Sequence, residues 1–138
     1  MKRIYLAAPL FSAAEIAFNL KFSEELNNEG YITFLPQLEC KNKKLTDIFS
    51  ICKGGIDKAD VVVAVMDGAD ADSGTCWECG YAFAKNIPVI LVRSDFRNSG
   101  DTRGFNAMLY YCAAGVVESE TDYFVQTITL LKRLFNKQ

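Results

Sequence analysis

The stretch VVVAVMDGADADSGTCWECGYAFAK, residues 61–85, decides how the chain folds. Its first six residues, 61–66, are all apolar, which is typical of a strand buried on both faces of a sheet. Residues 77–85 follow with a pattern that predicts a helix. The join between strand and helix is acidic and then turn-prone through Ser73-Gly74. In an open α/β sheet, ligands bind at the carboxyl ends of the strands, so this join is the predicted site.

Two carboxylates flank a glycine within the join. Asp72 lies in the loop, and Glu78 is expected in the first turn of the helix, six positions later and beyond Gly74. Thr75 and Glu78 also fit a capping box, in which the two side chains satisfy backbone amides at a helix start. The capping box would explain Glu78 without any chemistry, and the aspartates would then be a solvated loop. The combination of two carboxylates around a glycine favours a functional site.

Strands and helices alternate on both sides of this stretch. This order predicts an α/β fold, a three-layer α/β/α sandwich with a five-stranded parallel sheet of the flavodoxin or Rossmann kind, in a single domain over residues 1–138. The Gly-x-Gly-x-x-Gly and Walker A motifs are absent, so a dinucleotide or nucleoside triphosphate is not implied. The expected strands are 2–8, 31–35, 61–66, 87–92 and 115–118, and the expected helices are 13–28, 45–58, 77–85 and 121–137.

Four local features complete this outline. Ser12 and Glu15 have the capping-box spacing at the start of the first helix. Residues 37–44 are polar and end in a lysine cluster, for which we expect a solvated loop rather than a phosphate site, with a lid over the substrate as the alternative. Asp60 begins the third strand at its amino end and is expected far from the site. Tyr5 is either an ordinary strand aromatic or a group whose hydroxyl reaches the site.

Composition excludes several classes of function. The chain has 138 residues, half of them apolar, and a formal net charge of −2. That charge argues against a nucleic-acid-binding surface. No apolar run reaches membrane-spanning length, and the first residues show no signal-peptide pattern, so we expect a cytoplasmic protein that binds neither nucleic acid nor membrane.

Cysteine and histidine content narrows the chemistry further. Five cysteines, an odd number in a chain with a good core, predict reduced thiols rather than a disulfide framework. Cys76 and Cys79 form a C-x-x-C, which is either a redox pair or, more commonly, two small apolar residues on a helix. The chain has no histidine, so acid–base and nucleophilic work falls to carboxylates, tyrosine, cysteine or lysine.

Three segments together resemble the nucleoside 2-deoxyribosyltransferase family. They are IYLAAPLF at 4–11, residues 59–64 continuing through DSGTCWECGYA at 72–82, and GFNAMLY at 104–110. The middle segment is the most specific, and together the three cover nearly the whole chain. The resemblance implies an enzyme that exchanges the nucleobase of a 2′-deoxyribonucleoside for a free nucleobase.

The resemblance also implies roles for individual residues. Glu78 matches the nucleophile that attacks the anomeric carbon, and Asp72 matches the carboxylate that passes a proton to or from the base. Tyr5 matches the tyrosine that holds the nucleophile. Asn106 and Met108 match the segment that binds the sugar's 5′-hydroxyl in a neighbouring subunit's site, so a homo-oligomer is implied.

Two residues of the quoted segments and one outside them complete the expected site. We expect Phe11 and Gly74 to contact the substrate. Where several family members carry an Asp or Asn facing the nucleobase, this chain has Cys52. We therefore expect Cys52 at the base-facing wall, and the choice between purine and pyrimidine stays open.

The implied chemistry agrees with these residue types. A carboxylate can form a covalent glycosyl intermediate, and a helix N-terminus is expected to favour the ionised form of Glu78. A second carboxylate in its acid form, Asp72, can protonate the leaving base. Nearby negative charge stabilises an oxocarbenium-like transition state, and attack by a second base gives net retention. No metal or organic cofactor is expected.

Three other functions remain open. Water as the acceptor would give a nucleoside or 2′-deoxynucleoside 5′-monophosphate N-glycosidase, for which Arg93, Arg97 and Arg103 could bind a phosphate. However, the glycine- and arginine-rich phosphate loop of such hydrolases is missing after the first strand, which favours the transferase. A non-catalytic nucleotide-binding module on the same fold is the second alternative, since fold does not fix function. A redox role for Cys76 and Cys79 is the third.

Overall fold

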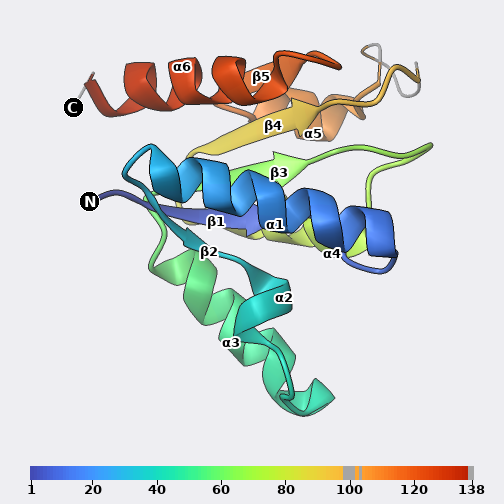
Figure 1. The fold of residues 1–138 in the computed structure, drawn as a ribbon, viewed down its shortest axis with the longest axis vertical. Helices are drawn as coiled ribbons and strands as arrows, with labels where there is room; N and C mark the ends of the chain where they lie inside the picture. The colour runs from blue at the N-terminus through green and yellow to red at the C-terminus, as the bar shows by residue number, and fades with distance from the viewer. Residues whose placement is uncertain (98–101, 103, 137–138) are drawn as a thin grey trace.

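The computed structural model describes residues 1–97, 102 and 104–136. Strands and helices alternate along the chain, as expected from the sequence (Figure 1). The strands are β1 (Arg3–Ala7), β2 (Ile32–Phe34), β3 (Val61–Val65), β4 (Val89–Arg93) and β5 (Gly115–Glu118). The helices are α1 (Ala13–Asn28), α2 (Pro36–Glu39), α3 (Leu45–Asp57), α4 (Ser73–Ala84), α5 (Ala107–Cys112) and α6 (Tyr123–Asn136).

The strands form one parallel sheet in the order β2-β1-β3-β4-β5. The chain leaves β1 first toward one edge of the sheet and later continues toward the other, so the order reverses between β1 and β3. Ligands of doubly wound sheets bind outside the carboxyl ends of the strands at such a switch point. The loop from β3 to α4 and the end of β1 meet there, which agrees with the predicted position of the site.

Helices cover both faces of the sheet and make the three expected layers. Figure 1 shows α1 and α6 in front of the sheet and α4 behind it. On the front face, Phe22 of α1 and Leu131 of α6 pack on strand residues such as Val63. On the other face, Ile56 of α3 and Cys79 of α4 join a second cluster. All five residues of β3 are buried, which explains its unbroken apolar sequence.

Several local predictions are confirmed and one is wrong. Ser12 caps α1, and it forms the reciprocal capping box with Glu15. Asp60 accepts a hydrogen bond from the Arg3 amide (2.7 Å) at the amino ends of the strands, far from the site. The expected loop 37–44 instead begins with a short helix, α2, because Pro36 stands at its first position, where a fixed φ and a missing N–H cost nothing.

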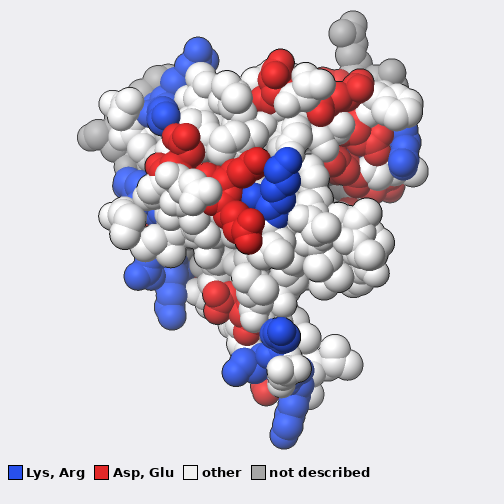
Figure 2. All heavy atoms as spheres, in the orientation of Figure 1, with Lys and Arg blue, Asp and Glu red and all other residues white. Residues whose placement is uncertain are grey.

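Charges of both signs are interspersed on the face drawn in Figure 2. Positive side chains gather at the end of the molecule where α2 is followed by α3, which is the part of the chain that carries Lys41, Lys43 and Lys44. Acidic side chains gather over the loops at the opposite end of the view. Within the described part of the chain, no helix is long and apolar enough to cross a membrane.

Candidate active site

Asp72, rather than Thr75, caps the central helix. Its Oδ2 accepts hydrogen bonds from the Thr75 amide (2.9 Å) and from the Thr75 Oγ1 (3.0 Å). The helix therefore begins at Ser73, four residues before the predicted start, and the predicted capping box of Thr75 with Glu78 is wrong. Glu78 lies in the second turn, not the first. Its carboxylate is consequently free for a role other than capping.

Tyr5 and Glu78 form the centre of the site. The Tyr5 hydroxyl donates a hydrogen bond of 2.5 Å to Glu78 Oε1. The two residues are 73 positions apart and come from β1 and α4, so the fold rather than local sequence brings them together. The Tyr5 ring is fully buried and stacks on Phe34, with centroids 5.1 Å apart and planes 14° from parallel. The hydroxyl is thus held at one end of a fixed ring.

Burial changes the ionisation of both groups. It raises the pKa of Glu78 to about 7; the Tyr5 hydrogen bond acts in the opposite direction, and the charge of Asp72 adds to the increase. The expected stabilisation of ionised Glu78 by the helix N-terminus does not prevail, because Glu78 lies beyond the first turn, where the helix dipole acts. Burial and the neighbouring Glu78 also raise the pKa of Tyr5, so Tyr5 stays protonated and donates.

A cavity of about 600 Å³ opens onto Glu78, whereas the fully buried Tyr5 lies behind its wall and does not line it. It has the size of a typical small-molecule site and contains apolar walls with a few polar groups. Of the residues expected from the sequence, Asp72, Glu78, Phe11, Cys52 and Gly74 all line it.

Three of these lining residues have distinct surroundings. Phe11 is 79% exposed at the cavity edge. Cys52 lies beside the Tyr5 hydroxyl, with which it interacts. A Cβ on Gly74 would come within 3.2 Å of Asp72 Oδ2, so glycine leaves room for that carboxylate.

Asn106 and Met108 do not join this cavity within one chain. They line a separate apolar hollow of about 770 Å³ between α4 and α5, together with Phe83 and Tyr111. Asn106 caps α5 by accepting a hydrogen bond from the Met108 amide (2.9 Å). The Met108 side chain is 81% exposed. These two predicted binding residues therefore lie outside the Glu78 cavity of their own chain.

The arginines proposed for a phosphate site have other positions. Arg93 is fully buried and donates to the carbonyl oxygens of Met66 (2.6 Å), Gly68 (3.0 Å) and Arg97 (2.9 Å). It therefore organises the loops after β3 and β4 and is neither a solvated loop residue nor a phosphate ligand. Arg97 pairs with Asp95 (3.4 Å). Arg103 lies outside the described residues.

The C-x-x-C cysteines also have structural surroundings. Cys79 is fully buried in the core between α4 and the sheet. Cys76 packs against that cluster, and burial raises the pKa of both thiols. A thiol with a raised pKa is a poor nucleophile at neutral pH. These surroundings favour the apolar interpretation of the pair over the redox one.

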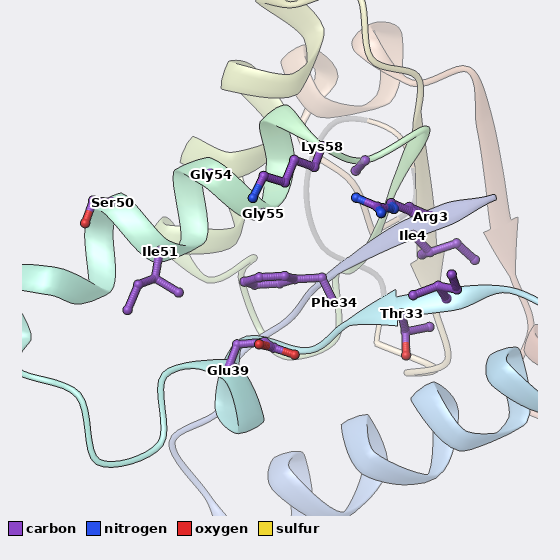
Figure 3. A pocket seen from close by; sticks show the side chains of 12 residues that line it. Arg3, Ile4, Thr33, Phe34, Glu39, Ser50, Ile51, Gly54, Gly55 and Lys58 are labelled. Carbon is purple, nitrogen blue, oxygen red and sulfur yellow. The ribbon is translucent and has the colours of Figure 1, made fainter. Parts of the chain in front are cut away.

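A third hollow, of about 510 Å³, lies between α3 and the edge strand β2 (Figure 3). Phe34 stands in it, with Arg3 and Lys58 on one side and Glu39 on the other (Figure 3). It contains none of the residues expected in the site, but its Phe34 ring stacks on the Tyr5 ring that holds Glu78. Gly55 lies so close to this ring that a Cβ there would approach Phe34 Cζ to 2.7 Å.

Sequence reasoning missed several contributors to the cavity. Thr75 was expected to cap a helix and instead holds Asp72. Gln37 and Cys40 enter the cavity because α2 forms where a loop was expected, and Pro36 was the signal that could have predicted that helix. Apolar Leu45 and Ile48 of α3 also line it. In the described ranges, no group of three or more His, Cys, Asp or Glu side chains is placed to hold a metal ion.

Known structures share this fold over nearly the whole chain. A conserved protein from Enterococcus faecalis V583 has 25% identity and a TM-score of 0.78, over 96% of this chain and 99% of that one. A 2-deoxyribosyltransferase from Bacillus psychrosaccharolyticus has 25% identity and a TM-score of 0.73, over 87% and 88%. A CMP N-glycosidase from Clostridium botulinum has 16% identity and a TM-score of 0.66, over 93% and 98%, which shows a shared fold.

Sequence comparison gives the family. Comparison with curated proteins gives no match. The family model described as nucleoside 2-deoxyribosyltransferase matches residues 4–124, which is most of the chain and includes every residue of the site described above. The chain therefore belongs to the nucleoside 2-deoxyribosyltransferase family.

Proposed function

We propose that this protein transfers 2-deoxyribose from one nucleobase to another through a covalent ester on Glu78. The observation that carries the proposal is the Tyr5–Glu78 hydrogen bond of 2.5 Å, which holds Glu78 at the wall of a 600 Å³ cavity that Asp72 also lines. A nucleophilic carboxylate needs to be held in one orientation beside the substrate, and a leaving base needs a proton donor. Tyr5 and Asp72 supply these two functions.

In the first step, Glu78 attacks the anomeric carbon of a bound 2′-deoxyribonucleoside. Tyr5 occupies Oε1, which leaves Oε2 to form the new C–O bond. The bond from the sugar to the base nitrogen breaks, and its electron pair leaves with the base. Asp72 donates the proton that the base nitrogen takes up. Thr75 holds Asp72 through Oδ2, which leaves Oδ1 for this transfer.

In the second step, a different nucleobase enters and reverses the chemistry. Its nitrogen attacks the anomeric carbon, the ester C–O bond breaks, and Glu78 regains its carboxylate. The proton on the attacking nitrogen passes to Asp72, which is then ready for the next cycle. Two displacements at the same carbon give net retention of configuration. No cofactor enters either step.

A second copy of the chain is part of the proposal. The Glu78 cavity has no contact with Asn106 or Met108 of its own chain, although both lie in the matched family region. The hollow around Met108 is apolar and carries exposed Phe83 and Tyr111, the kind of surface that protein contacts cover. We therefore propose a homo-oligomer in which this segment completes the neighbouring subunit's site.

Hydrolysis is the alternative that one observation supports. Lys41 lines the Glu78 cavity and could pair with a substrate 5′-phosphate. The same Glu78 ester would then be attacked by water. The substrate would be a 2′-deoxynucleoside 5′-monophosphate, and free sugar phosphate would be the product.

One chromatographic assay tests these functions. Purified protein is incubated with a 2′-deoxyribonucleoside and a different free base, and separately with a 5′-monophosphate. A new deoxyribonucleoside in the product trace is the expected result, and Glu78→Ala should abolish it without changing the circular dichroism spectrum. Release of free sugar or sugar phosphate alone would show the hydrolase. If no substrate is consumed, or if Glu78→Ala keeps its rate, the proposal is wrong.

A further inference from the structure

Two cysteines face each other in the wall of the Glu78 cavity. Cys40 follows α2, and Cys52 lies in α3, twelve residues later. Their Sγ atoms are 3.6 Å apart, and both residues line the cavity. A disulfide bond needs about 2.0 Å between the sulfur atoms. The two thiols are therefore within the reach of a small side-chain rotation.

The two thiols of the pair differ in ways that suit stepwise oxidation. Burial raises the pKa of Cys52 to about 12, so it remains a thiol at neutral pH. Both thiols are partly exposed, and Cys40 stands between the exposed residues Glu39 and Lys41, where a small oxidant can reach it. Oxidation of one accessible thiol with a second thiol in contact gives a disulfide rather than further oxidation.

The other three cysteines have different partners. The Cys76 thiol faces the carbonyl oxygen of Ala71 (3.9 Å), and the Cys112 thiol faces that of Leu109 (3.1 Å). Cys79 is fully buried in the core. Among the described residues, none of these three thiols is seen in contact with a second thiol, as Cys40 is with Cys52.

We propose that Cys40 and Cys52 are an oxidation site at which a peroxide forms a reversible disulfide. The Cys40 sulfur attacks one peroxide oxygen, the O–O bond breaks, and Cys40 sulfenic acid and one water result. The Cys52 sulfur then attacks the Cys40 sulfur, the S–O bond breaks, and the departing hydroxide leaves as water with the Cys52 proton. The two thiols lose two electrons, and the peroxide gains them.

The disulfide would change the cavity. It would tie the end of α2 to α3 across the cavity wall, and it would remove the S–H group that now lies beside the Tyr5 hydroxyl. Because Tyr5 holds Glu78, we expect the oxidised protein to be less active in whichever reaction Glu78 performs. Formation of the disulfide itself does not depend on the function proposed above.

Peptide mapping tests the site directly. The purified protein is treated with hydrogen peroxide, remaining thiols are alkylated, and trypsin is added. The two cysteines fall in different tryptic peptides, 22–41 and 45–53, whereas Cys76 and Cys79 share peptide 59–85. The expected result is a cross-link between peptides 22–41 and 45–53, and a fall in the thiol titre from five to three per chain. Dithiothreitol should restore the titre.

Matched variants separate the outcomes. Cys40→Ser should abolish the cross-link, and Cys112→Ser should leave it unchanged. A cross-link that involves any other cysteine, or oxidation of Cys40 to sulfinic acid with no cross-link, would overturn the proposal. If the reduced protein consumes no substrate but still forms this cross-link with peroxide, the proposed function is refuted and the oxidation site stands.

Discussion

Replacement of Tyr5 by phenylalanine isolates the hydrogen bond at the centre of the site. Phe keeps the ring that stacks on Phe34 and loses only the hydroxyl that donates to Glu78 at 2.5 Å. That bond opposes the effect of burial on the pKa of Glu78, which stands at about 7. Its loss should therefore raise the pKa of Glu78 further and leave less of this proposed nucleophile ionised at neutral pH.

The magnitude follows from the strength of a hydrogen bond to a charged group. Such a bond contributes about 1.5–3 kcal/mol, and one pKa unit corresponds to about 1.4 kcal/mol, so the pKa of Glu78 should rise by about 1–2 units. At pH 7 the ionised fraction would fall from about one half to between about one tenth and one hundredth. The exchange rate should fall about 5- to 50-fold and recover in part at higher pH.

The assay is a pH–rate profile of base exchange for the wild type, Tyr5→Phe and a control, Tyr31→Phe. Tyr31 packs on Phe135 and lies away from the cavity. The wild-type rate should rise with pH through about 7, because Glu78 attacks only when ionised in the proposed mechanism. The midpoint of this rise should move upward in Tyr5→Phe and stay in place in the control. An unchanged midpoint in Tyr5→Phe would refute the argument that this hydroxyl sets the ionisation of Glu78.

Three further predictions concern stability and positioning. Because the pKa of Glu78 is higher in the folded protein (about 7) than in the unfolded chain (4.5), the wild type should lose stability as the pH rises between these values. In urea titrations, the free energy of unfolding of Glu78→Gln should exceed that of the wild type by up to about 3 kcal/mol at pH 8 and show no gain at pH 4. Thr75→Val should cost about 1–2 kcal/mol and slow exchange, whereas Thr75→Ser should restore the rate; equal rates in both variants would contradict the positioning role. Gly55→Ala should lower the thermal midpoint of unfolding and cost about 1–3 kcal/mol, because its Cβ would clash with the Phe34 ring. Gly54→Ala should raise the midpoint, because the space around Gly54 is open and alanine favours a helix. The reverse order of the two midpoints would show the packing argument to be wrong.

Much of the fold was predictable because it rests on short-range patterns. The unbroken apolar run of β3 and the alternation of strands and helices predict a parallel sheet with helices on both faces. The family resemblance predicts that Tyr5 holds Glu78, and the structure places the two side chains in direct contact. These features could be predicted because each depends only on the strand or helix to which a residue belongs.

The helix cap, the ionisation of Glu78 and the position of Arg93 each depend on competing interactions, and the sequence alone does not show which interaction is stronger. Asp72 and Thr75 can each cap a helix, and only the structure shows that Asp72 does so. Burial and the Tyr5 hydrogen bond act in opposite directions on the pKa of Glu78, and burial prevails. Arg93 looks like a loop residue in the sequence, but its guanidinium fills a core position by donating to three carbonyl groups. Such outcomes depend on contacts between residues far apart in the chain.

The most direct test of the covalent mechanism is to detect the ester itself. The protein is mixed with a 2′-deoxyribonucleoside without an acceptor base, quenched in acid, digested with trypsin and analysed by mass spectrometry. We predict a deoxyribosyl adduct on peptide 59–85, located at Glu78, which a free nucleobase discharges as a new nucleoside and which Glu78→Gln lacks. Base exchange that proceeds without an adduct, or an adduct on another carboxylate, would contradict the assignment of Glu78 as the nucleophile.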